Sequence, residues 1–136
     1  MSDIPDGFKT AEFTGPFLDR NGTYYLKRDG EVWLVGQRVE SRHVNYIDLA
    51  HGGMLATLAD VALSLQPYLS EQPNPAVTTS SLTVNFVAAA RLGDWIVAHP
   101  VVDRLGKRAA QVHGRILRGD EVLATMSGVF AIHRPA

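Results

Sequence analysis

Hydrophobic and polar positions follow two different periods along this chain of 136 residues. In the middle of the chain, residues 54–65 are apolar on nearly every side, and only Thr57, Asp60 and Ser64 interrupt them. A helix without a polar face is buried on most of its sides. The pattern therefore predicts a central buried helix, which Pro67 ends or kinks because proline lacks the backbone N–H that a helix needs.

Downstream of this helix the period switches to two, which is the period of β-strands. Four such runs follow one another, written SSLTVNFV, DWIVAHPVV, AAQVHGRIL and EVLATMSGVFAI. The turn signals RLGD, LGK and RGDE separate them, and links this short predict an antiparallel meander. Pro100 lies inside the second run and indicates an edge position or a bulge at that point.

The chain upstream of the helix contains one further β signal. The segment TYYLKRDGEVWLVGQRV predicts a β-hairpin around the turn Asp29–Gly30. Residues 1–21 mix proline and glycine with scattered apolar positions, so we expect a loosely ordered lead-in or a short helix there. A helix that is apolar all round can be covered if a curved sheet wraps it, and the predicted class is therefore α+β.

Composition and charge narrow the function classes. Residues 1–136, with 46% hydrophobic and 20% charged residues, fit a single globular domain. A net charge of −1 gives no electrostatic reason to expect nucleic acid or an anionic membrane as a partner. Cysteine is absent, which excludes thiolate chemistry, and the histidines lack the spacing of a metal site. The polar start, without a basic and apolar leader, predicts a cytoplasmic protein.

Asp60 is the first candidate for chemistry. It is the only acidic residue between Asp48 and Glu71, and it lies about two turns into the apolar helix. Burying an unpaired carboxylate costs several kcal/mol. Asp60 is therefore either a structural acid that hydroxyls or backbone groups satisfy, or a general base or nucleophile.

Gly52 and Gly53, at the start of the same helix, are the second candidate. A helix N-terminus offers unpaired N–H groups and partial positive charge, which suit an oxyanion, and glycine lets a ligand approach the backbone. The alternative is that the two glycines only form a tight turn. Gly52 and Asp60 are eight residues apart, or roughly 12 Å along one helix. One helix cannot supply both groups to one carbonyl, so joint action requires Gly52 of one subunit to face Asp60 of another.

The motif N-x5-HGG-x6-D resembles that of the hotdog-fold thioesterase superfamily, and it is formed by Asn45, His51, Gly52, Gly53 and Asp60. The similarity is greatest to the phenylacetate-degradation and 4-hydroxybenzoyl-CoA thioesterase branch. The later segments VTTSSLTVNFVAAARLGD and DRLGKRAAQVHGRILRGDEVLATMSGVFAI are similar to strands of the same family. The resemblance extends over about residues 30–133 with order and spacing kept.

This resemblance implies a hotdog fold, in which an antiparallel sheet of five to six strands wraps around one long central helix. It also implies hydrolysis of acyl-CoA thioesters, with CoA as part of the substrate and no other cofactor. Homodimers that share two active sites are implied as well, often paired into tetramers. By the branch resemblance, an aromatic acyl group comes first and a medium-chain fatty acyl group second.

The resemblance also implies roles for single residues. Asp60 matches the general base or nucleophile, and Gly52 matches the backbone donor to the oxyanion. Asn45 matches a side chain that positions the thioester carbonyl or the attacking water. His51 matches a residue that shapes the loop before the helix. Sequence alone does not choose between water activation by Asp60 and direct attack to give a mixed anhydride.

The resemblance leaves the roles of two positions near the first strand after the helix less certain in register or shape. Thr79 falls where some members of the family place a Ser or Thr hydroxyl near the nucleophilic water, and Thr78 takes that place if the register differs by one residue. Ala89 stands where the family often has proline, which leaves the shape of the acyl pocket open.

CoA brings phosphates, which require cations or backbone N–H groups. The candidates are the turn residues Arg91, Arg104, Lys107 and Arg108, whose alternative role is that of ordinary solvated charges. Two other functions stay open. One is a hydratase or dehydratase of acyl thioesters, in which a histidine acts together with a carboxylate, and the other is a non-catalytic acyl-CoA binding protein.

Overall fold

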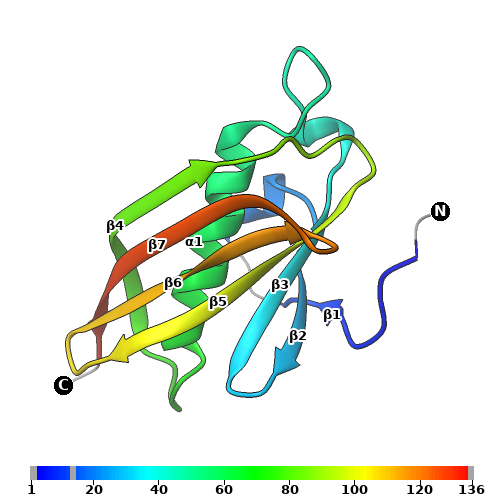
Figure 1. The fold of residues 1–136 in the computed structure, drawn as a ribbon. Coiled ribbons are helices and arrows are strands. Elements are labelled where there is room, and N and C mark those ends of the chain that lie inside the picture. The colour runs from blue at the N-terminus through cyan, green and yellow to red at the C-terminus, as the bar shows by residue number, and fades with distance from the viewer. Residues whose placement is uncertain (1–2, 13–14, 135–136) are drawn as a thin grey trace.

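One helix lies inside a strongly curved antiparallel sheet, in a computed structural model that describes residues 3–12 and 15–134 (Figure 1). The seven strands run in the order β1-β2-β3-β5-β6-β7-β4. The helix is α1 (Gly52–Tyr68), and the strands are β1 (Lys9–Thr10), β2 (Tyr25–Asp29), β3 (Val32–Arg38), β4 (Ala76–Phe86), β5 (Trp95–Leu105), β6 (Ala109–Arg118) and β7 (Glu121–His133). This architecture confirms the predicted hotdog fold. The expected five to six strands were too few, because a short strand from the lead-in adds to the sheet.

The described part of the lead-in is attached to the rest of the fold. Strand β1 pairs with β2, and the Ala11 N–H donates to the Tyr24 carbonyl at 2.8 Å. A 3-10 turn, η1 (Leu18–Arg20), follows, and a second one, η2 (Ser41–His43), precedes α1. Residues 1–2 and 13–14, which fall within the predicted lead-in, lie outside the described residues, as do residues 135–136.

Helix α1 begins at Gly52 because the preceding residue caps it. His51 has extended backbone angles, φ −64° and ψ 139°, and its Nδ1 accepts the Gly53 N–H at 2.8 Å. Pro67 was predicted to end or kink the helix, and the helix ends one residue after it, at Tyr68. Proline removes one helical hydrogen bond, but the Leu69 N–H still reaches the Leu65 carbonyl at 2.9 Å and closes the last turn. None of the helices among the described residues has the length and apolar character of a bilayer span.

The sheet covers α1 on most sides but leaves one stripe uncovered. Leu58, Ala59, Ala62 and Leu63 are fully buried. Four polar positions of the helix recur every three or four residues and are at most partly buried, namely Thr57, Asp60, Ser64 and Tyr68. This spacing places them on one face. The helix is therefore central as predicted, but the face that carries Asp60 is open.

Strands β5, β6 and β7 form the predicted meander, and their inward positions are buried. The prediction was wrong for β4, which pairs with β7 at the far edge of the sheet and not with β5. Residues 87–94 connect β4 to β5 and cross one end of the sheet (Figure 1). A link of that length allows β4 to pair either with β5 or with a strand at the other edge. Closing the sheet around α1 requires a strand on each side of the helix.

The predicted hairpin is formed by β2 and β3, but its turn lies one residue later than predicted. Asp29 pairs with Val32, so the two-residue loop is Gly30–Glu31. Gly30 has φ +61° at the first loop position, which is where a type II′ turn requires glycine. The twist of this turn matches that of the flanking strands, and this explains the shift.

A buried glutamine replaces a strand where β3 and β5 separate. Their ladder ends at the pair Val35–Ala98, so Pro100 lies on an edge of β5, as predicted. The Gln66 side chain donates from Nε2 to the Trp33 carbonyl at 2.9 Å and accepts the Trp33 N–H at 3.0 Å. The Gln66 side chain thus satisfies the N–H and the carbonyl of Trp33, which lies on β3 beyond the last residue that pairs with β5.

Replacing Gln66 with leucine is expected to lower the free energy of unfolding by about 1–3 kcal/mol, because two partly buried backbone groups of Trp33 lose their partners. Urea unfolding at one protein concentration measures the change. The matched control is Gln111→Leu, at an exposed position of β6, which should stay within about 0.5 kcal/mol of the wild type. Equal stability of the two variants would show that Gln66 does not stabilise the gap.

Candidate active site

Asp60 lies on the open face of α1, at the wall of a hollow of about 760 Å³ that we call the Asp60 hollow. The expectation of a buried acid was wrong, because within one protomer the residue is only partly buried. The hollow is lined by α1, β4 and the segment before β2, through Glu12, Phe17, Leu18, Ala56, Thr57, Asp60, Val61, Ser64, Leu65, Tyr68, Val77 and Leu82. Polar and apolar side chains both contribute to its wall, and Asp60 is among them.

Thr79 on β4 orients the Asp60 carboxylate. Its Oγ1 donates a hydrogen bond to Asp60 Oδ1 at 2.6 Å, whereas the Thr78 hydroxyl lies 3.0 Å from His133 Nε2. Of the two threonines predicted as alternatives, Thr79 is therefore the one that contacts Asp60. A β-bulge between Thr79 and Ser81 explains how Thr79 and Leu82 can both face the helix, since the extra residue shifts the alternation by one.

The second carboxylate oxygen, Asp60 Oδ2, has no hydrogen-bond partner among the described residues. The neighbouring hydroxyls do not compete for it, because Thr57 and Ser64 donate to the helix carbonyls of Gly53 at 2.8 Å and Asp60 at 2.7 Å. A carboxylate held at one oxygen and open at the other is arranged to accept a proton or to attack an electrophile.

The role of this face could have been read from the sequence more fully. Thr57, Ser64 and Tyr68 line the hollow together with Asp60, and the four residues are three or four positions apart along α1. In the sequence, Thr57 and Ser64 look only like interruptions of an apolar helix. Their spacing of three or four residues was the signal that one stripe of the helix faces a cavity.

A second hollow, of about 400 Å³, lies at the N-terminus of α1, and we call it the Gly52 hollow. Its lining includes Asn45, Gly52, Phe86 and residues 88–90. The Gly53 N–H is occupied by His51 Nδ1, whereas the Gly52 N–H has no partner among the residues that the structure describes. One backbone donor at the positive end of the helix is therefore available to a ligand.

Asn45 shapes the loop that leads to this hollow. Its Oδ1 accepts the backbone N–H groups of Ile47 and Leu49, each at 3.1 Å, and Asp48 in the same loop has φ +62°. Since the carbonyl oxygen is committed to the backbone, the Nδ2 group is what remains for a ligand. A donor of this kind suits a carbonyl oxygen as its partner.

Asp60 and Gly52 belong to the same helix and face different hollows. The eight residues between them correspond to roughly 12 Å of helix. The two groups of one protomer are therefore too far apart to act on a single carbonyl, as the sequence argument required.

The candidate phosphate ligands lie at two opposite ends of the molecule. Arg104, Lys107 and Arg108 line a hollow of about 820 Å³ at the β5–β6 turn, which we call the basic hollow. Arg91 lies at the other end of the sheet, where it forms a bridge with Leu49 ahead of α1. The structure thus brings three of the four predicted cations together and separates the fourth.

Sequence reasoning missed Arg134, which also lines the basic hollow. Its guanidinium contacts Glu71 Oε1 at 2.6 Å and donates to the Lys107 carbonyl. Arg134 follows the last strand, and no local motif marks it. The pairing of β6 with β7, in which Ala109 lies opposite Ala131, brings the end of the chain to the β5–β6 turn.

Comparison with known proteins identifies the family. The thioesterase superfamily model matches residues 48–125. A Pseudomonas aeruginosa protein provisionally named an esterase is 37% identical over 131 residues, which cover 96% of this chain and 98% of that protein. Human acyl-coenzyme A thioesterase 13 is 33% identical over 73 residues, which cover 54% of this chain and 51% of that enzyme.

A solved structure agrees in fold. The crystal structure of a Bacillus halodurans protein with CoA superposes with a TM-score of 0.72 at 22% identity, over 82% of this chain and 74% of that one. At this identity the likeness shows the fold alone, whereas the family model and the Pseudomonas relative extend to the motif around Asp60. The chain belongs to the thioesterase superfamily.

Proposed function

We propose that the protein hydrolyses an acyl-CoA thioester to the free acid and CoA, at a site that two protomers build together. The observation that carries the proposal is the Asp60 carboxylate, which Thr79 orients at the wall of the Asp60 hollow. Family membership supports thioester hydrolysis, and the names of the human relative and of the structure solved with CoA support acyl-CoA as the substrate.

The proposed chemistry needs one base and one oxyanion donor. Water attacks the thioester carbonyl carbon while its proton passes to Asp60 Oδ2, and the oxyanion accepts the Gly52 N–H of the partner subunit. The C–S bond then breaks, and the CoA thiolate takes the proton from Asp60. In the covalent alternative Asp60 itself attacks, CoA leaves, and water hydrolyses the mixed anhydride.

The free edge of β4 supports a homodimer. Among the described strands only β7 pairs with this 11-residue strand, AVTTSSLTVNF, which carries no charge and no proline. Such an edge is prone to pair with another strand. Phe86 and Val87 at its end are 55% and 61% exposed, beside the Gly52 hollow. A twofold pairing of β4 with its copy would extend the sheet and bring the two helices close together.

The phosphates of CoA are assigned to the predicted cations. Arg104, Lys107 and Arg108, joined by Arg134, surround the basic hollow, and Arg91 offers a guanidinium without a side-chain partner among the described residues. The two locations lie at opposite ends of α1, about 25 Å apart by helix rise, so a given phosphate contacts one of them. Alanine substitutions at Arg91 and in the basic hollow distinguish the two locations. The substitution that raises KM identifies the location that binds a CoA phosphate.

A hydratase reaction is less well supported by the geometry. His51 Nδ1 accepts the Gly53 N–H, so in the neutral ring the proton is on Nε2. His51 cannot act as a base through Nε2 while it caps the helix. This observation favours hydrolysis with Asp60 as the only proton acceptor.

A panel of acyl-CoA substrates with a thiol-detecting reagent tests the proposal. We expect free thiol to be released in proportion to enzyme, fastest with an aromatic or medium-chain acyl group. Hydration of an enoyl-CoA releases no thiol and would support the hydratase alternative. Tight binding of acyl-CoA without turnover of any substrate would support a binding protein, and either result would contradict the proposed function.

A further inference from the structure

The loop of residues 87–94, between β4 and β5, crosses the N-terminal end of α1 and lines the Gly52 hollow. It is attached to the chain segment that enters the helix. The Ala50 N–H donates to the Ala90 carbonyl at 2.8 Å, and Leu49 forms a bridge with Arg91. Ala50 precedes Gly52 by two residues, so the position of this loop influences the direction of the Gly52 N–H.

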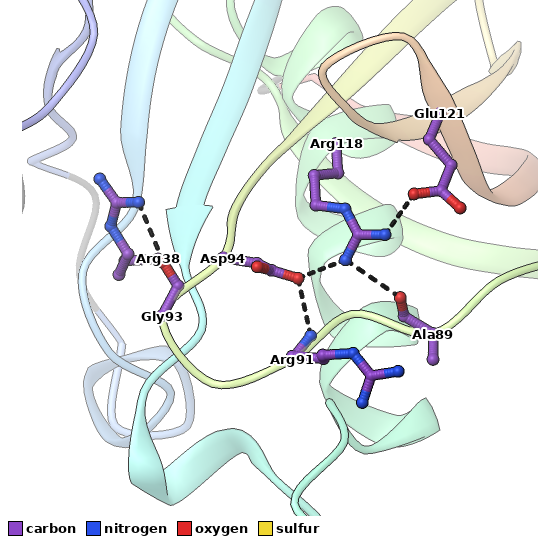
Figure 2. Close-up of polar contacts among 7 residues, drawn as sticks. All are labelled: Arg38, Ala89, Arg91, Gly93, Asp94, Arg118 and Glu121. Carbon is purple, nitrogen blue, oxygen red and sulfur yellow. Dashed lines mark hydrogen bonds and ion pairs between the residues drawn. The ribbon is translucent and has the colours of Figure 1, made fainter.

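Arg118, at the end of β6, holds this loop from one side (Figure 2). Its guanidinium donates to the Ala89 carbonyl at 3.3 Å and to Asp94 Oδ2, and a third bond to Glu121 fixes the side chain itself. Asp94 in turn accepts the Arg91 backbone N–H at 2.8 Å. One side chain therefore connects both ends of the loop to the sheet.

A second arginine holds the loop from the other side. Arg38 on β3 donates to the Gly93 carbonyl at 3.1 Å (Figure 2). Its guanidinium lies over the Trp95 ring. The Gly93 N–H also donates to the Val39 carbonyl at 2.8 Å. The Ala89 end also has backbone support, since the Val87 and Ala88 N–H groups donate to the Leu123 carbonyl at 2.8 and 3.1 Å. Among the described residues, Arg118 is the one side chain that reaches the Ala89 end.

The charges of this cluster reinforce the geometry. Burial alone would raise the pKa of the Asp94 carboxyl, but the hydrogen bonds from Arg91 and Arg118 and the charges of both arginines outweigh it and lower the pKa. Hydrogen bonds to Glu121 and Asp94 raise the pKa of Arg118. Both shifts favour the charged forms of Asp94 and Arg118, and opposite charges favour short and directional hydrogen bonds.

We propose that Arg118 is a positioning residue for the oxyanion donor, acting through Ala89, Ala90 and Ala50 on the backbone at Gly52. The inference rests on the proposed thioester hydrolysis. Arg118 does not line the Gly52 hollow or the Asp60 hollow, so its contribution is to kcat and not to substrate binding.

The test compares Arg118→Met, Arg118→Lys and the wild type in kcat and KM. We expect Arg118→Met to lower kcat by about 10–10²-fold, less than the loss of the donor itself, with KM changed by less than about threefold. Lysine keeps the charge beside Asp94 but cannot reach three acceptors at once, so Arg118→Lys should recover part of the rate. The matched control is Arg28→Met, whose arginine bonds the Gly30 carbonyl in the distant β2–β3 turn, and its kcat should equal that of the wild type.

Amide hydrogen exchange at residues 50–53 is a second measurement, and it does not depend on activity. Exchange there should be faster in Arg118→Met than in Arg28→Met, even if the wild type hydrolyses no acyl-CoA and the proposed function fails. An active wild type together with unchanged kcat and unchanged exchange in Arg118→Met would overturn the inference, whatever its melting temperature. If Arg118→Met does not fold, Arg118→Lys and Asp94→Asn permit the same comparison.

Discussion

Replacing Asp60 with asparagine is expected to lower kcat for acyl-CoA hydrolysis by about 10²–10⁴-fold, the usual contribution of a general base. The amide has the same shape and its oxygen can still accept the Thr79 hydroxyl, but it can neither accept a proton nor attack a carbonyl. Since Asp60 is only partly buried, the fold and the KM should change little. Steady-state kinetics with a thiol reagent and thermal unfolding measure both effects.

Thr78→Val is the matched control for the Asp60 face. Its hydroxyl lies beside His133 on the neighbouring strand, one residue away from the threonine that contacts Asp60. Its kcat should stay within about twofold of the wild type, as expected for a surface substitution away from the site. Near-normal turnover by Asp60→Asn would refute the assignment of the base.

The second large effect is expected from Gly52→Pro, which removes the proposed oxyanion donor. Gly52 is the first residue of α1, where proline is well tolerated, and His51 already has the backbone angles that a residue before proline prefers. The substitution removes the Gly52 N–H without breaking an intramolecular hydrogen bond of the described residues. We expect kcat to fall by about 10²–10³-fold, as for other lost oxyanion donors.

Gly52→Ala is the control that distinguishes the loss of the N–H from the effect of adding a Cβ. A Cβ at this position would lie 3.3 Å from Phe86 Cζ, the far end of a half-exposed side chain that can move by a few tenths of an ångström. Alanine adds this Cβ but keeps the donor, so most of the activity should remain. Equal kcat values for the proline and alanine variants would show that the N–H does not act in the reaction.

Most of the fold could be predicted from the sequence because local periodicity determines the elements. The period of two in β6 and β7 identified their buried faces, and the apolar run identified α1. The neighbour of β4 could not be predicted, since an eight-residue link permits either a hairpin or a crossover. The decision depends on closure of the sheet around the helix, which is a tertiary effect.

The candidate site could be predicted in part. The motif around Asp60 and Gly52 is local in sequence, and the helix rise already separated the two residues. The contact of Asp60 with Thr79 depends on a bulge in β4, which leaves no local pattern. Arg134 meets Lys107 because β6 pairs with β7, and Arg91 is separated from the other cations because it lies at the opposite end of β5.

Mixed dimers of two inactive variants test the central claim most directly. Asp60→Asn and Gly52→Pro are co-expressed and purified together, and each alone is nearly inactive. If each site takes Asp60 from one chain and Gly52 from the other, every mixed dimer contains one intact site. Random pairing should then restore about one quarter of the wild-type activity, since half of the dimers are mixed and one of their two sites is intact. If the co-expressed protein forms mixed dimers but remains as inactive as the separate variants, the two residues do not act across the subunit interface.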